Sequence, residues 1–544
     1  MATLAPTMIG TRPRAHSAVL DQTMHPAGRW LFFAAAVLGL GYAGISIFTD
    51  TQHVGENIAI GAFLFLGLAL LIALGFEFVN GFHDTANAVA TVIYTNALPA
   101  HVAVVWSGVW NFIGVLTSSG AVAYSIITLL PVDLILHVGS AGGYAMIFAL
   151  LLAAVIWNLA TWFVGLPNSS SHALIGSILG VGLANQLLAP APGGTSGVEW
   201  GQAIKVLNGL WMAPLLGFGA AMLLLLVMKA LVRNPKLYRE PEEGAPPPAG
   251  IRALLILTCT GVSYAHGSND GQKGMGLIML ILIGVAPTAY ALNRTMPESA
   301  TPAYVASADA AAGVLASHGR AGEDVASARG VLTEALRTKQ VTSPAVYGAA
   351  AAVSRDVTQR IRGYGAIRNV PAAATPNLRN DMYLVLDTTQ RIAKAKPAGF
   401  SEGELKTLGG YQTQLEQGTR YIPTWVKVAV ALALGLGTMI GWRRIVVTVG
   451  EKIGKQHLTY GMGAAAEIVA AVTILLADRF ALPVSTTHIL SSGVAGASVA
   501  NGAGLQGRTV RNLALAWVMT LPAAMALSGM LYWLLLTLTR AAGL

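Results

Sequence analysis

Long apolar runs alternate with short polar loops along most of the chain. About 20 apolar residues cross the hydrocarbon core of a bilayer as a helix, and many of the runs approach that length. They cover residues 30–48, 58–76, 102–130, 141–166, 206–228, 253–265, 275–293, 428–442, 459–477 and 512–538. The pattern predicts an all-α polytopic membrane protein with about ten to twelve transmembrane segments, some of them half-spans.

Composition and charge support a membrane protein. The chain is 54% hydrophobic and 11% charged, whereas soluble domains average about 25% charged residues. Its net charge of +9 would suggest nucleic acid as the partner of a soluble protein. Here, however, Lys and Arg gather in short loops at 229–252, 443–455 and 508–511, which is typical of cytoplasmic loops. The expected partner is therefore the lipid bilayer and not nucleic acid.

Residues 294–420 interrupt the membrane pattern. They hold 26 of the 59 charged side chains, and Ala-rich stretches with apolar residues three and four apart predict a small helical bundle. The basic loops on either side are cytoplasmic by the same charge argument, and residues 428–442 make one crossing, so this soluble insert is expected to be periplasmic. Residues 1–57 add an N-terminal tail and an extra apolar helix, which resembles an uncleaved signal anchor.

Two pairs of short motifs reveal an internal repeat. NGFHDTANA (80–88) matches HGSNDGQKG (266–274), and LPNSSSHAL (166–174) matches LPVSTTHIL (482–490). The two halves fall into register once the soluble insert is removed. The predicted domains are a first membrane repeat at 58–232, a cytoplasmic loop at 233–252, and a second repeat split into 253–293 and 421–544 around the insert at 294–420.

The second motif of each pair predicts an anion site. In both copies a proline stops one helix, and three hydroxyl residues follow that can cap the next helix, whose free N–H groups and positive dipole end attract anions. Duplicated transporters place such broken helices at the membrane midplane. The alternative is that these residues are ordinary helix caps. The candidate ligands are Ser169, Ser170 and Ser171 in one copy and Ser485, Thr486 and Thr487 in the other.

The first motif of each pair carries an acid into an apolar segment, where an ionisable side chain is costly enough to be functional by default. Asp84 and Asp270 are expected to bind the coupling cation. Asn87 lies three residues beyond Asp84, on the same helical face, whereas Lys273 takes that place beyond Asp270. Because an ammonium can neutralise Asp270 as a second sodium ion would, this difference favours proton over sodium coupling.

Other polar residues near the motifs are candidates for a proton relay, although each could equally serve as a neutral hydrogen-bonding group. Glu77 is expected to lie near a helix end and is given less weight. The relay candidates are His83, His172, His266, His488 and Glu467.

Together NGFHDTANAVAT, HGSNDGQKGMG, GLPNSSSH and LPVSTTHILSSGVAG resemble the inorganic phosphate transporter (Pit) family, above all its bacterial low-affinity, proton-coupled permeases of the inner membrane. The resemblance implies two inverted repeats with broken or re-entrant helices. It also implies phosphate held by the two Ser/Thr triplets, and an ion and phosphate centre at Asp84, Asn87, Asn269 and Asp270. The resemblance further implies that phosphate is accepted as a neutral complex with a divalent metal. No resident cofactor or metal is implied.

The sequence leaves several alternatives. A sodium-coupled symporter or a transporter of another tetrahedral oxyanion such as sulfate would use the same residues. An intramembrane hydrolase could pair Ser169 with His172, but it would need a complete catalytic set, and a sensor would not need polar motifs inside the membrane. The oligomeric state is open, a homodimer included.

Overall fold

The computed structural model describes residues 26–54, 60–130, 141–188, 197–241, 245–320 and 324–542; the side chains of residues 85–87 are not among those described. The described part is built from helices, with one isolated β-bridge between Gly454 and Leu505. The helices of the first half are α2 (Pro26–His53), α3 (Ile60–Tyr94), α4 (Ala100–Thr117), α5 (Ala121–Ile127), α7 (Ala141–Phe163), α8 (Ser170–Leu188), α9 (Trp200–Leu231) and η1 (Pro235–Leu237).

The second half contains the insert and the remaining long helices. They are α10 (Ala249–Val285), α11 (Pro287–Tyr290), η2 (Glu298–Ala300), α12 (Thr301–His318), α13 (Val325–Thr338), α14 (Pro344–Tyr364), η3 (Ile367–Asn369), η4 (Ala372–Ala374), α15 (Thr375–Ala395), α16 (Glu402–Thr419), α17 (Thr424–Thr438), α18 (Arg443–Glu451), α19 (Tyr460–Arg479), α20 (Thr486–Asn501) and α21 (Gly507–Ala541).

The all-α polytopic architecture expected from the sequence is confirmed. Eight described helices are long and apolar enough to cross a membrane, or nine if the bent pair of α16 and α17 counts as one span. The shorter α17 and α20 and the more polar α10 pack among these eight. Many large apolar side chains on the outside of the bundle are exposed, Leu71 on α3 and Leu215 on α9 among them, as expected for a surface that faces lipid.

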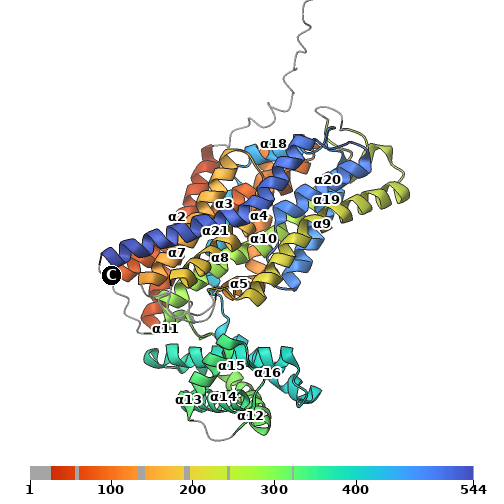
Figure 1. Ribbon diagram of the computed structural model, residues 1–544. Coiled ribbons are helices and arrows are strands. Elements are labelled where there is room, and N and C mark those ends of the chain that lie inside the picture. Colours follow the sequence, from red (N-terminus) through yellow and green to blue (C-terminus); the bar gives the residue numbers. More distant parts are fainter. Residues whose placement is uncertain are drawn as a thin grey trace, which may run out of the picture.

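Helices α12 to α16 form a separate unit below the membrane bundle (Figure 1). Its apolar core is distinct from the cores of the bundle and includes Leu332, Val357 and Leu386. The two ends of this unit meet, because the Asn293 N–H donates to the Gly418 carbonyl oxygen at 2.8 Å. The insert therefore leaves and rejoins the bundle at one place.

The two repeats contact each other through matching crossings. Helix α3 packs on α17, and its counterpart α10 packs on α4. Small residues allow the backbones to approach, as is common between membrane helices. A Cβ atom on Gly81 would lie 2.3 Å from the Leu434 carbonyl oxygen, and one on the corresponding Gly267 would lie 2.2 Å from the Asn111 carbonyl oxygen. The two copies of the sequence repeat thus make equivalent helix crossings, with a glycine at the same position in each.

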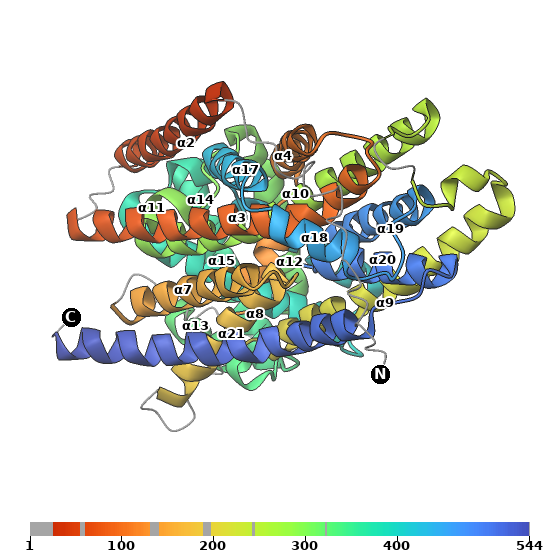
Figure 2. The same cartoon turned by 90° about the horizontal axis from the view of Figure 1, so that it is seen from above.

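The paired helices run in opposite directions. Arg252, near the start of α10, donates to the carbonyl oxygen of Ala97, just beyond the end of α3, at 2.8 Å. Seen from above, α3 and α10 are antiparallel, as are α9 and α21 (Figure 2). The two copies are therefore inverted with respect to each other, and their acidic motifs meet near the middle of the bundle.

The basic loops gather at one end of the bundle. Lys229 donates to the Ala500 carbonyl oxygen at 3.1 Å, and the His457 N–H donates to Glu240 at 3.1 Å. The insert lies at the other end (Figure 1). There Asp50, near the end of the extra N-terminal helix α2, accepts hydrogen bonds from Tyr290 and Trp425.

Candidate functional site

Two helical hairpins, α7–α8 and α19–α20, bring broken helices into the centre. Each first helix ends before a residue with positive φ, Gly165 at 69° and Ala481 at 54°, a conformation that commonly ends helices. A Leu-Pro pair follows in both copies. Ser169 and Ser485 then accept hydrogen bonds from the backbone N–H groups of His172 and His488, at 3.1 and 3.2 Å. These two serines are the caps of α8 and α20.

Asp84 on α3 lies between the two hairpins and accepts hydrogen bonds from both. Ser170 donates to its Oδ2 at 3.1 Å, and Thr487 donates to its Oδ1 at 2.5 Å. Thr486 is 3.5 Å from Oδ2. All four side chains are buried. Hydroxyl groups from both copies therefore converge on one carboxyl group, beside the starts of two helices.

Asp270 on α10 forms a buried ion pair with Lys273, and the Nζ–Oδ1 distance is 2.7 Å. Neither side chain is exposed to solvent. The Lys273 ammonium also donates to Ser171 Oγ at 2.5 Å and to the Val484 carbonyl oxygen at 3.3 Å. This lysine thus links the second acidic motif to the tips of both hairpins, which sequence spacing alone did not reveal.

His266 connects the two acids. Its Nε2 atom is 3.5 Å from Asp270 Oδ2 and 3.9 Å from Asp84 Oδ2, while its Nδ1 atom is 2.8 Å from Asn111 Oδ1. One ligand atom each from Asp84, His266 and Asp270 lie within 4.8 Å of one another. Carboxylate and imidazole groups at such distances can share a cation.

The Asn269 side chain holds the tip of the second hairpin. It donates to the Leu482 carbonyl oxygen at 3.1 Å and accepts from the Val484 N–H at 3.3 Å. Both polar groups of the Asn269 amide therefore form hydrogen bonds with the hairpin backbone in this structure. The side chain of Asn87, the other asparagine expected at the centre, lies outside the described residues.

The histidines and Glu467 divide into two groups. His83 contacts Asp84, at 3.3 Å, and Thr161, so it joins His266 beside the acids. His172 and His488 instead face each other, with ring centroids 4.5 Å apart. Glu467 is buried and accepts a hydrogen bond from Thr258 at 2.5 Å, away from the contacts of Asp84 and Asp270.

Glu77 is a buried acid beside the second acidic motif that the sequence argument undervalued. The expectation that it lies near a helix end is wrong, because α3 runs from Ile60 to Tyr94 and Glu77 is fully buried within it. Gly274, one turn beyond Asp270, makes room for it, since a Cβ atom there would lie 2.2 Å from Glu77 Cγ. The seven-residue spacing from Asp84, two helical turns, was the available signal.

Comparisons with known proteins identify the family of the chain. The chain matches the Phosphate transporter family over residues 80–528. It is 43% identical to the low-affinity inorganic phosphate transporter PitA of Escherichia coli (strain K12), over 87% of this chain and 98% of the relative. It is 41% identical to PitB of the same organism, over 89% of this chain and 99% of the relative.

A solved structure, "The sodium-dependent phosphate transporter", is 19% identical, with a TM-score of 0.49, and the match covers 87% of this chain and 99% of that chain. The relatives are named as transporters, so the hydrolase alternative does not hold. With a family match over most of its length and relatives above 40% identity, the chain belongs to the Phosphate transporter family.

Proposed function

We propose that this protein imports inorganic phosphate together with protons, as a secondary active symporter of the bacterial inner membrane. The observation that carries the proposal is the buried ion pair between Asp270 and Lys273, at 2.7 Å. Lys273 stands where the first repeat has Asn87. A fixed ammonium neutralises the second acid, which removes the electrostatic reason for a sodium ion there.

The anion is proposed to bind at the starts of α8 and α20. Free N–H groups and the positive dipole ends of two helices favour a tetrahedral oxyanion. Ser170, Thr486 and Thr487 supply hydroxyl donors, and Ser171 is linked to Lys273. Ser169 and Ser485 serve as caps, so their contribution is to orient the two helices.

Asp84 provides the coupling. An ionised carboxylate is only an acceptor, whereas a protonated one can also donate. While Asp84 is ionised, it accepts hydrogen bonds from Ser170 and Thr487. A proton on Asp84 weakens these bonds and leaves the hydroxyls available to phosphate. Phosphate binding and proton binding then favour each other, as symport requires.

His83 and His266 are the proposed proton donors to Asp84. One ring nitrogen of each lies close to its carboxylate: His83 Nδ1 is 3.3 Å from Oδ1, and His266 Nε2 is 3.9 Å from Oδ2. His172 and His488 form a separate stacked pair, and Trp517 lies against His488 with ring centroids 4.3 Å apart. We assign that pair to the packing of the hairpins and leave Glu467 outside the relay.

The orientation follows from the basic loops. They cluster at the end of the bundle that carries Lys229 and His457, and such loops stay in the cytoplasm. The insert at 294–420 is therefore proposed to lie in the periplasm. The start of α2 is at the cytoplasmic end, since Asp50 near the other end of α2 meets Tyr290 and Trp425.

The cargo is proposed to include phosphate as a neutral complex with a divalent metal. The observation that favours this form is the cluster of Asp84, His266 and Asp270, whose ligand atoms lie within 4.8 Å of one another beside the hydroxyl donors. A metal that arrives bound to phosphate brings its own counter-charge, so the Lys273 ammonium opposes it less than it opposes a free sodium ion. In vesicles, labelled zinc should enter with phosphate in a fixed ratio, and His266→Ala should reduce zinc entry more than phosphate entry. Phosphate entry unaffected by removal of all divalent metal would exclude the complex.

Reconstituted vesicles test the coupling ion. Labelled phosphate should accumulate under an inward proton gradient without sodium, and a sodium gradient at fixed pH should add nothing. The matched variant is Lys273→Asn, which gives the second copy the Asp-x-x-Asn pattern of the first and should make uptake respond to sodium. Labelled sulfate should be excluded, because sulfate offers no proton to an acceptor carboxylate. Sodium-dependent uptake by the wild type would overturn proton coupling.

A further inference from the structure

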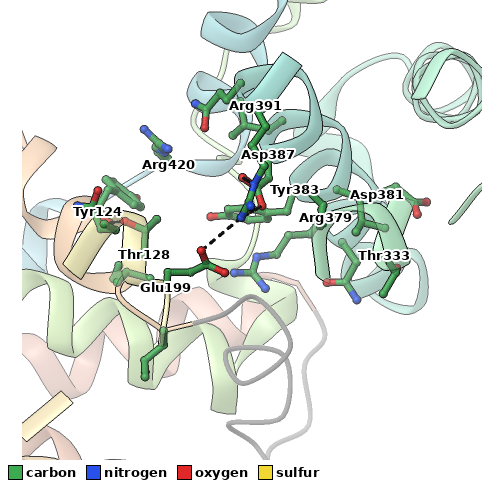
Figure 3. A pocket seen from close by; sticks show the side chains of 18 of the residues that line it. Tyr124, Thr128, Glu199, Thr333, Arg379, Asp381, Tyr383, Asp387, Arg391 and Arg420 are labelled. Atoms are coloured by element: carbon green, nitrogen blue, oxygen red, sulfur yellow. Dashed lines mark hydrogen bonds and ion pairs between the residues drawn. The ribbon is translucent and has the colours of Figure 1, made fainter. Parts of the chain in front are cut away.

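A cavity of about 780 Å³ lies between the soluble insert and the membrane bundle. Its walls come from α13, α14 and α15 on one side and from α5 and the start of α9 on the other (Figure 3). Ala481, the residue with positive φ at the tip of the second hairpin, also lines it. Ala481 immediately precedes Leu482, whose carbonyl oxygen accepts from Asn269. The cavity therefore extends from the insert to the hairpin that carries Ser485, Thr486 and Thr487.

The lining is strongly basic. It contains eight Lys and Arg residues against three acidic residues. Some of these cations are already paired: Arg329 binds Asp381 at 2.6 Å, and Arg391 joins Asp387 to Glu199. The Arg391–Glu199 pair, at 3.3 Å, bridges the insert and the bundle across the cavity (Figure 3). It holds the two walls together.

Other cations in the lining form no salt bridge within 4 Å with an acidic residue that the structure describes. They are Lys205 on α9, Lys339 at the end of α13, and Arg379 on α15. Arg379 is 5% exposed, and its Nε atom has no hydrogen-bond partner in the described part of the chain. Its guanidinium lies 4.6 Å from the centre of the Tyr383 ring, and Figure 3 shows it directed toward the side of the cavity where Glu199 lies.

A buried guanidinium without an anion is expensive, because its lost hydration is not replaced. Guanidinium groups match the geometry of tetrahedral oxyanions with two parallel N–H donors. A cleft lined by charge of one sign also raises the local concentration of ions of the other sign. An anionic cargo approaching from the insert side would meet this cavity before the hairpins.

We propose that the cavity is a phosphate-binding vestibule, in which Arg379 together with Lys205 and Lys339 captures inorganic phosphate before it reaches the hairpins. The inference rests on the proposed function, since it assumes that phosphate approaches from the side of the insert. It adds a second, peripheral phosphate site to the central one. The insert, which showed no chemistry in the sequence, thereby contributes a wall and a ligand to the transport path.

The test is the phosphate dependence of uptake by full-length Arg379→Gln in vesicles of phosphatidylcholine. A unit charge at contact distance in water changes affinity about fivefold, so KM should rise by about that factor while the maximal rate stays unchanged. Arg379→Lys should recover most of the loss. The matched control is Arg355→Gln, which removes an exposed arginine of the same insert outside the cavity and should leave KM unchanged.

Salt separates electrostatic capture from structural damage. The difference between Arg379→Gln and wild type should be large at about 10 mM ionic strength and nearly vanish at about 1 M, where the Debye length falls from about 30 to about 3 Å. A fall in maximal rate with unchanged KM would overturn the vestibule, as would equal KM values in low salt. An effect confined to vesicles with phosphatidylglycerol would make the cavity a lipid headgroup site and also overturn it. Failure of the wild type to take up phosphate would instead refute the proposed function.

Discussion

The buried pair of Asp270 and Lys273 gives the most quantitative prediction. Replacing Lys273 by Met keeps a side chain of similar length and removes the ammonium, which leaves Asp270 buried without its ion-pair partner at 2.7 Å. Removal of one partner from a buried ion pair costs about 3–5 kcal/mol, because the remaining charge is uncompensated. Lys273→Met should therefore lower the free energy of unfolding by about that amount.

A second variant separates the charge from the packing. Asp270→Asn with Lys273→Met removes both charges and keeps nearly the same volume, so it should recover most of the lost stability, since an uncharged pair in such a position is often as stable as the ion pair. Lys236→Met is the matched control, because the Lys236 side chain is exposed and exposed substitutions change stability by about 0.5 kcal/mol or less.

The assay is equilibrium unfolding in mixed micelles with increasing sodium dodecyl sulfate, followed by tryptophan fluorescence. The reasoning is refuted if Lys273→Met unfolds at the wild-type detergent fraction. It is equally refuted if the double variant is no more stable than the single one, because the loss would then come from packing or from the hydrogen bonds to Ser171 and Val484.

Three further predictions concern coupling, packing and acid stability. Asp84→Asn should reach the membrane at wild-type levels yet lose accumulation of labelled phosphate, because an amide cannot bind the coupling proton; accumulation at the wild-type rate would exclude this role. Gly267→Ala should lower the free energy of unfolding in detergent by about 1–3 kcal/mol, because its Cβ atom would lie 2.2 Å from a carbonyl oxygen of α4; an unchanged free energy would mean that the crossing can relax. Hydrogen bonds from the backbone and side chain of Ser401, and then from His318, lower the pKa of Glu404 in the insert from 4.5 to about 2. The stability that ionised Glu404 contributes is present above pH 4.5 and is lost as the pH falls toward about 2. Pepsin cleavage of the insert should therefore depend less on pH in that window in Glu404→Gln than in the wild type. Identical pH profiles of cleavage would contradict the lowered pKa of Glu404.

The repeat and the residues of the centre could be predicted because they depend on local signals. Pro167 and Pro483 mark breaks, the hydroxyl triplets mark helix starts, and an acid such as Asp84 is conspicuous in an apolar segment. In a duplicated membrane protein these signals also imply that the copies meet. The meeting of Ser170 and Thr487 on one carboxylate follows from that symmetry.

The remaining features depend on contacts between distant parts of the chain. Glu77 fits into its buried position because Gly274 on another helix has no side chain. Lys273 donates to the carbonyl oxygen of Val484, 211 residues away. The basic cavity lies where Arg391 and Glu199, 192 residues apart, bridge the insert and the bundle. The seven-residue spacing places Glu77 on the face of Asp84, but no spacing in a single sequence encodes the partners on other helices, since these contacts arise from how the helices pack.

Coupling of protons to phosphate through Asp84 is the central claim, and proton movement tests it most directly. Sodium-free vesicles with a pH-sensitive dye inside and a clamped membrane potential should acidify when phosphate is added outside to the wild-type protein. Asp84→Asn vesicles, with the same amount of inserted protein, should show no phosphate-induced acidification. Acidification that persists in Asp84→Asn, or phosphate uptake by the wild type without any proton entry, would contradict the account.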